Sequence, residues 1–136
     1  MRHLVLAVLL AASSAALACG HCVEDKVASV YDHELIRRAV AGGRHVVFFH
    51  VDGPVVRDEA TRRALVGAAE SLTGVDRGSV RVALETQTLA LCFDPRRGSL
   101  VAIQESLEKR LAARRLVFYP LKMIERPAEL KEISRR

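Results

Sequence analysis

The residues of this chain best suited to chemistry are Cys19-Gly20-His21-Cys22, a Cys-x-x-Cys with a histidine inside it. A long amphipathic stretch follows directly, so both thiols are predicted to lie at a helix N-terminus. Backbone N–H groups and the helix dipole favour negative charge there, and we therefore expect the pKa of these thiols to be lowered. Thiolates at this spacing exchange disulfides or bind soft metal ions, and His21 suits either use. A structural disulfide without chemistry is the third possibility.

The first 18 residues have the pattern of a secretory signal peptide. Arg2 lies in a short basic start, residues 4–12 are an apolar run, and Ala16-Leu17-Ala18 is a small-residue cleavage site. Cleavage after Ala18 makes Cys19 the first residue of an exported protein, with an α-amino group beside its thiol. We expect a location in the bacterial periplasm or cell envelope, with a lipid-anchored form at Cys19 as the alternative. No later segment predicts a transmembrane helix.

Length and charge exclude several classes of function. The 136 residues less the signal leave 118, the size of one domain. The whole chain has 21 Lys and Arg against 16 Asp and Glu, and no basic stripe is interleaved with aromatic residues. Nucleic acid is therefore not an expected partner. No Ser-His-Asp set, phosphate-binding glycine loop or carboxylate pair indicates a hydrolase or kinase, and we expect no organic cofactor.

The first half of the mature chain predicts two helices separated by a strand. Apolar side chains recur at three- and four-residue spacing over residues 23–41, which predicts a single amphipathic helix. Residues 45–52 are rich in β-branched and aromatic side chains on both faces, as in a strand buried on both sides. Asp58 suits the N-cap of a second helix, and Gly74 its C-terminal stop.

Two alternating runs within residues 80–93 predict a β-hairpin. In the second run Leu89, Leu91 and Phe93 share one face, and Ala90 and Cys92 share the other. We expect the first set to face two helices of a sandwich. The second set is expected to face the N-terminal helix.

The order of predicted elements indicates the fold class. Ser99 is the predicted N-cap of a further helix, and residues 116–124 are predicted to form the last strand. The resulting strand-helix-strand-strand-helix-strand order predicts an α+β fold, a ferredoxin-like βαββαβ sandwich over residues 44–125. Residues 19–43 carry the Cys-x-x-Cys and the extra helix that is expected to cover the open face of the sheet. The charged tail, residues 126–136, is expected to fray.

Three short motifs within this domain carry a family resemblance. They are Leu72-Thr73-Gly74-Val75, the Val80-x-Val82 alternation, and Leu91-Cys92-Phe93-Asp94-Pro95 leading to Ser99. In this order they resemble the heavy-metal-associated domains of copper chaperones and metal-transporting ATPases, over residues 45–124. The resemblance implies a ferredoxin-like domain that binds a soft metal ion and exchanges it with a metal-transfer partner protein.

The chain departs from that family at the metal-binding loop. The family's Cys-x-x-Cys follows its first strand, whereas this chain has Asp52-Gly53-Pro54-Val55-Val56 there. The only Cys-x-x-Cys is the one at the mature N-terminus. We therefore expect Cu(I) or Zn(II) to be bound by Cys19 and Cys22, with His21 or the α-amino group completing the site. Weaker candidate ligands are His50, Asp52 and Cys92.

A second resemblance keeps an enzymatic alternative open. Cys-Gly-His-Cys is similar to the redox motif of protein disulfide isomerase-like members of the thioredoxin fold. That fold needs a strand before the motif, and this chain has none there. It also needs a cis-proline, but no proline precedes Ser79-Val80. A thiol–disulfide oxidoreductase with Cys19 and Cys22 as its catalytic pair nevertheless remains an alternative, because the chemistry needs only an accessible pair. A non-catalytic interaction domain with a surface disulfide is the other.

Overall fold

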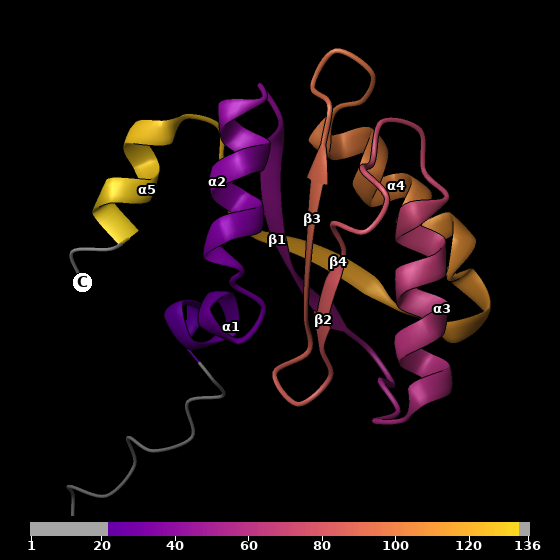
Figure 1. The fold of residues 1–136 in the computed structure, drawn as a ribbon. Coiled ribbons are helices and arrows are strands. Elements are labelled where there is room, and N and C mark those ends of the chain that lie inside the picture. The colour runs from indigo at the N-terminus through magenta and orange to yellow at the C-terminus, as the bar shows by residue number, and fades with distance from the viewer. Residues whose placement is uncertain (1–21, 134–136) are drawn as a thin grey trace, which may run out of the picture.

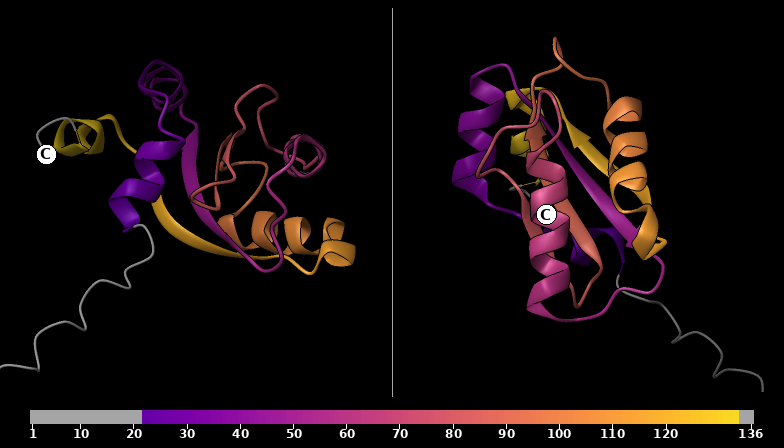
Figure 2. Two further views of the ribbon diagram at one scale, coloured as in Figure 1. Left: turned by 90° about the horizontal axis from the view of Figure 1, so that it is seen from below. Right: turned by 90° about the vertical axis from the view of Figure 1, so that its right-hand side faces the viewer.

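The computed structural model describes residues 22–133, which form one antiparallel sheet between two layers of helices (Figure 1, Figure 2). In chain order the elements are α1 (Val23–Ser29), α2 (His33–Ala41), β1 (His45–Asp52), α3 (Glu59–Glu70), β2 (Arg81–Ala83), β3 (Thr88–Phe93), α4 (Leu100–Arg110), the 3-10 helix η1 (Ala112–Arg114), β4 (Val117–Ile124) and α5 (Pro127–Ile133). The fold of this part is α+β, as predicted. The predicted signal sequence, residues 1–18, and Cys19 to His21 lie outside the described residues.

The sheet has the strand order β2-β3-β1-β4, and every neighbouring pair is antiparallel. This arrangement is compatible with a ferredoxin-like fold. The central strand β1 is buried on both faces: Val47 and Phe49 enter one core, while Val46 and Phe48 enter the other. Its prediction as a doubly buried strand is therefore confirmed.

The first face of the sheet is covered by α3 and α4, which Figure 2 shows together on one side. Both helices begin at the predicted caps. The Asp58 carboxylate accepts a hydrogen bond from the Thr61 backbone N–H at 2.7 Å, and the Ser99 hydroxyl accepts one from Ala102 at 3.2 Å. The core on this face contains the predicted strand residues of β3, which are Leu89, Leu91 and Phe93.

The second face is covered by α1, α2 and α5. Each contributes at least one buried side chain, among them Val27, Ile36 and Leu130. Ala90 and Cys92 of β3 point into this core. The predicted division of β3 between the two faces is thus confirmed on both sides.

The prediction of a single helix over residues 23–41 is wrong. One helix ends at Ser29 and the next begins at His33, and Asp32 between them adopts an extended conformation. Its carboxylate accepts a hydrogen bond from the Leu35 backbone N–H at 3.1 Å and so caps a new helix. Aspartate favours this capping geometry over a helix interior, because its short side chain competes for backbone N–H groups.

The C-terminal tail also differs from the expectation of fraying. Pro127–Ile133 form α5, in which Leu130 is buried against the second face. Proline at the first helical position has no N–H to leave unpaired and a preset φ. No helix within residues 22–133 has the length and apolarity needed to cross a membrane.

Candidate metal site

Cys22 is the member of the Cys-x-x-Cys that the structure describes; Cys19 and His21 lie outside the described residues. It is the N-cap of α1, and its carbonyl accepts a hydrogen bond from the Lys26 backbone N–H at 3.0 Å. The side chain is exposed and makes no capping hydrogen bond, and among residues 22–133 it has no disulfide partner. The predicted position of Cys22 at a helix N-terminus is confirmed, and its side chain faces solvent.

The surroundings of Cys22 raise its pKa, so the expectation of a lowered value is wrong. The backbone N–H of Asp25 lowers the pKa of the thiol, but the carboxylates of Asp25 and Glu24 and slight desolvation together raise it above the ordinary value. Both acidic residues occupy the first turn of α1. The sequence contained this signal, since Glu24 and Asp25, two and three residues after Cys22, oppose a thiolate there.

Contacts around Lys26 fix α1, and with it Cys22, to the folded domain. Its ammonium donates a hydrogen bond to the Thr86 carbonyl at 2.9 Å and lies 3.1 Å from Nδ1 of His50. The hydroxyls of Ser29 and Thr86 lie 2.7 Å apart, and Val27 is buried. These contacts hold α1 beside the β2–β3 turn and the C-terminal end of β1.

His50 and Asp52, two weaker candidate ligands, have other partners. His50 is half-buried, and its Nδ1 also lies 3.1 Å from the Gln87 carbonyl. A carboxylate oxygen of Asp52 accepts a hydrogen bond from the Gly53 backbone N–H at 2.8 Å. The Lys26 ammonium beside His50 repels a cation, so this histidine is poorly placed for a metal.

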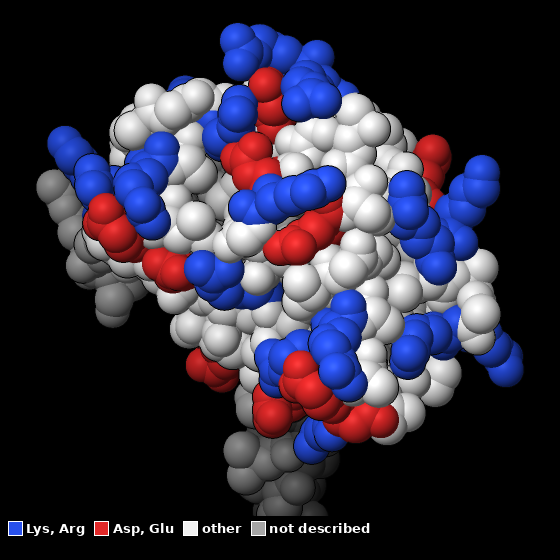
Figure 3. Space-filling model, turned by 45° about the vertical axis from the view of Figure 1, so that its right-hand side comes forward, with Lys and Arg blue, Asp and Glu red and all other residues white. Residues whose placement is uncertain are grey.

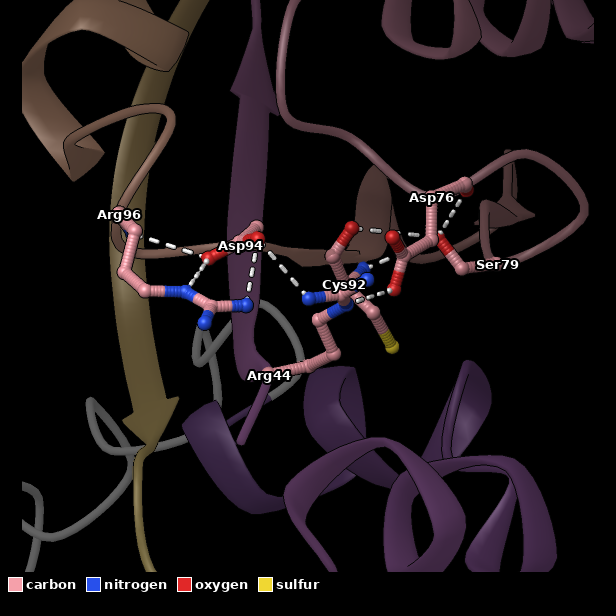
Figure 4. Close-up of polar contacts among 6 residues, drawn as sticks. All are labelled: Arg44, Asp76, Ser79, Cys92, Asp94 and Arg96. Carbon is pink, nitrogen blue, oxygen red and sulfur yellow. Dashed lines mark hydrogen bonds and ion pairs between the residues drawn. The ribbon is translucent and has the colours of Figure 1, made fainter. Parts of the chain in front are cut away.

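Cys92 is buried on the second face of the sheet and is 1% exposed. Burial and, to a smaller extent, the charge of Asp76 raise the pKa of its thiol to about 11. Its backbone N–H donates to the Ser79 hydroxyl at 3.1 Å, as Figure 4 shows. Burial of this kind is typical of a core cysteine.

The structure brings few of the candidate ligands together. Within residues 22–133, no three His, Cys, Asp or Glu side chains are close enough to hold a metal ion. Cys22 and Cys92 are both unpaired cysteines, one exposed and one buried. The predicted ligands Cys19 and His21 lie outside the described residues, so the structure does not place them relative to Cys22.

A second polar cluster, centred on Arg44, was not predicted from the sequence. Arg44 pairs with Asp76 and with Asp94, each at 3.0 Å, and Arg96 pairs with Asp94 at 3.1 Å (Figure 4). Hydrogen bonds from Arg96, and the charges of Arg96 and Arg44, lower the pKa of Asp94 to about 2. The cluster ties the end of β3 to the residue before β1. Its role is structural, because each of the two buried or half-buried carboxylates already has an arginine partner.

Comparison with models of known protein families and with curated proteins finds no match for this chain. The resemblance to heavy-metal-associated domains therefore stays a prediction. The function has to be argued from the chemistry and the position of the thiols.

Proposed function

We propose that this protein is an exported metal-binding protein that holds Cu(I) or Zn(II) through the thiolates of Cys19 and Cys22. His21, or the α-amino group that cleavage leaves on Cys19, completes the site. The observation that carries the proposal is the position of Cys22: its exposed thiol begins a helix that is fixed to the domain and has two carboxylates in its first turn. Soft thiolate ligands select these ions.

The acidic first turn of α1 favours metal binding over disulfide exchange. Exchange needs a free thiolate, and Glu24 and Asp25 both act against a bare negative charge on Cys22. A bound cation has the opposite requirement. The same carboxylates attract the ion, and the ion displaces the thiol proton. Two sulfur ligands alone suit Cu(I), whereas Zn(II) needs further ligands to complete a tetrahedron.

We also propose that residues 44–125 form a ferredoxin-like domain of the heavy-metal-associated type, with its Cys-x-x-Cys displaced to the mature N-terminus. The element order and the strand order β2-β3-β1-β4 support this. The contacts of Lys26 with His50 and Thr86 support it further, because they hold α1 at the end of the sheet where β1 finishes. The family's own metal-binding loop follows that same strand.

The test is metal binding by protein that is produced from the full-length sequence, exported, kept reduced and purified without a His tag. We expect about one Cu(I) or Zn(II) per chain under a competing chelator. Changing Cys19 and Cys22 together to Ser should abolish binding. Cys92→Ser is the matched control and should retain it, because that thiol is buried.

Three outcomes would contradict this proposal. Protein that stays metal-free after titration with both ions has no such site. Catalysis of insulin reduction, with a pair potential of about −120 to −230 mV, would indicate the oxidoreductase instead. Loss of binding in Cys92→Ser equal to that in the double variant would mean that the ligands come from across the sheet.

Intact mass of the exported protein tests the N-terminal part of the proposal. We expect a mass that begins at Cys19, as the cleavage pattern of residues 16–18 predicts. A mass increased by lipid would indicate the anchored form at the same cysteine. A mass that retains Met1 would contradict signal cleavage, and with it the α-amino ligand.

A further inference from the structure

A pocket lies in the helical layer of α3 and α4, alongside α4. Its volume is about 530 Å³, and its polar lining consists of Thr73, Arg97, Ser106, Lys109 and Arg110. The apolar part of the lining includes Leu72 and Ile103. The pocket is lined by residues of α4, and Figure 2 shows α4 and α1 on opposite sides of the sheet. Because Cys22 is the N-cap of α1, the pocket is separate from the proposed metal site.

The pocket is positively charged and has no acidic lining residue. Arg97, Lys109 and Arg110 are exposed, and their side chains make no ion pair or hydrogen bond with any other residue in the range 22–133. In the same range Arg44 and Arg96 are paired with carboxylates, whereas the exposed Arg57, Arg63 and Arg77 have no such partner. Figure 3 shows Lys and Arg side chains gathered along the right-hand edge of this side of the molecule. Three unpaired cations around one hollow favour an anionic ligand.

The backbone that carries Arg97 is held firmly. Gly74 has a φ of +87°, and a Cβ there would lie 3.3 Å from the backbone carbon of Arg97. The Gly74 carbonyl accepts a hydrogen bond from Asp94 at 2.8 Å, and the Asp94 carbonyl accepts one from Arg97 at 3.0 Å. The two loops therefore lie in close contact, and only glycine fits between them without strain.

The other two cations stand on an equally fixed element. Lys109 and Arg110 are in the last turn of α4, two and three residues after Leu107, which is fully buried. Cations at a helix C-terminus also compensate the dipole, which accounts for their presence without a ligand. It does not account for Arg97, which precedes the same helix, or for the hydroxyls of Thr73 and Ser106 between them.

We infer that this pocket binds the phosphate group of a ligand that also has an apolar part. Guanidinium groups such as those of Arg97 and Arg110 match phosphate oxygens in pairs, and Lys109 adds a point charge. The hydroxyls of Thr73 and Ser106 supply neutral donors, while Leu72 and Ile103 offer apolar contact. An anionic phospholipid headgroup and a soluble alkyl phosphate share this chemistry.

The binding test uses the exported protein with three probes: inorganic phosphate, hexyl phosphate, and vesicles with or without phosphatidylglycerol in phosphatidylcholine. We expect amide shifts in NMR at Arg97, Gly98 and Lys109 with both phosphates, with tighter binding of hexyl phosphate. Binding should weaken as salt is added. Co-sedimentation only with phosphatidylglycerol vesicles assigns the lipid source, and its absence assigns a soluble ligand. No shift with either phosphate and no co-sedimentation would overturn the inference.

Paired variants separate a built site from general surface charge. Arg97→Gln with Arg110→Gln should weaken hexyl phosphate binding about tenfold or more, because two charge-assisted contacts are lost. Arg57→Gln with Arg63→Gln is the matched control, since both arginines are exposed and neither lines the pocket. This control should change the affinity for hexyl phosphate less than about twofold, because salt screens distant exposed charges. Equal weakening by the control and the pocket variant would overturn the inference, since only net charge would then matter. Unchanged melting curves confirm that all variants are folded.

Discussion

The two faces of the sheet share their strands but are covered in different ways. One face is covered by α3 and α4, of 12 and 11 residues, each of which connects two strands. The other is covered by α1, α2 and α5, of 7, 9 and 7 residues, which come from the two ends of the described chain. Phe49, Phe93 and Phe118 lie in the first core, whereas Phe48 lies in the second.

This difference suggests how stability is distributed. Isolated helices this short are marginal in water, so α1, α2 and α5 depend on their contacts with the sheet. The helices α3 and α4 each connect to a strand at both ends. In contrast, α1 connects to α2, and α5 follows β4. We expect the first face to govern global unfolding and the second to open locally. The proposed metal ligand Cys22 belongs to the less stable layer.

The largest effect is expected from Phe93→Ala on the first face. Phe93 is 2% exposed, and its ring packs edge-on against His45 with centroids 5.6 Å apart. Truncation should lower the free energy of unfolding by about 3–5 kcal/mol, as for other large aromatic residues in cores. Urea unfolding measures this. A loss below about 1 kcal/mol would contradict the assignment of Phe93 to this core.

The alternation that assigns Phe93 could be predicted from the sequence alone. A strand has a period of two, so once β3 was placed, Leu89, Leu91 and Phe93 had to share a face. The N-caps Asp58 and Ser99 could be predicted equally well, because each capping hydrogen bond joins residues three positions apart. Local rules therefore sufficed for the first face.

The next effect compares the same substitution on the two faces. Leu107 of α4 is fully buried and Leu130 of α5 is 7% exposed. Leu107→Ala should lower the free energy of unfolding by about 2–5 kcal/mol, as in well-packed cores. Leu130→Ala should cost about 1–2 kcal/mol, because a terminal helix can shift to close the cavity. Equal losses, measured by urea unfolding, would mean that α5 is as firmly integrated as α4.

On the second face the cover by the N-terminal segment and the inward side of β3 could be predicted, but the details of its helices could not. Leu130 and Ile133 are apolar residues in a charged tail. Their burial depends on the second core, which exists only once the sheet has formed. Asp32, at the break between α1 and α2, also pairs with Arg81, 49 residues later, whose guanidinium lies 3.1 Å from its carboxylate. Likewise the contact between Lys26 and His50 exists only once α1 has docked. These features need the tertiary structure, whereas the acidic turn after Cys22 was visible in the sequence.

A smaller effect concerns pH and the polar cluster centred on Arg44, to which Asp94 belongs. Asp94 has its pKa lowered from 3.8 to about 2, chiefly by Arg96. Because the folded state holds this proton less tightly than the unfolded one, the stabilisation is fully present above about pH 4. It is lost as the pH falls toward 2. Asp94→Asn should remove it, so the stability difference from wild type should shrink between these values. A difference that stays constant with pH would contradict the role of the charge.

The smallest effect is expected from Lys26→Met, which tests how α1 is held. Methionine keeps the length and apolar stem of lysine but loses the hydrogen bond to the Thr86 carbonyl and the contact with His50. Global unfolding should change by only about 0.5–1.5 kcal/mol, the usual value of one net hydrogen bond.

Hydrogen exchange gives the sharper measurement for this variant. Amides of α1 should exchange faster while those of α4 stay unchanged, because α1 opens without the rest of the fold. Lys131→Met on α5 is the matched control, since Lys131 is exposed and no partner of its side chain is found in residues 22–133. If α1 exchanges equally in both variants, Lys26 does not fix this helix. The contacts of Lys26 then do not keep Cys22 near the end of β1. The proposal that the Cys-x-x-Cys lies at the end of the sheet where the family binds its metal would lose its structural basis.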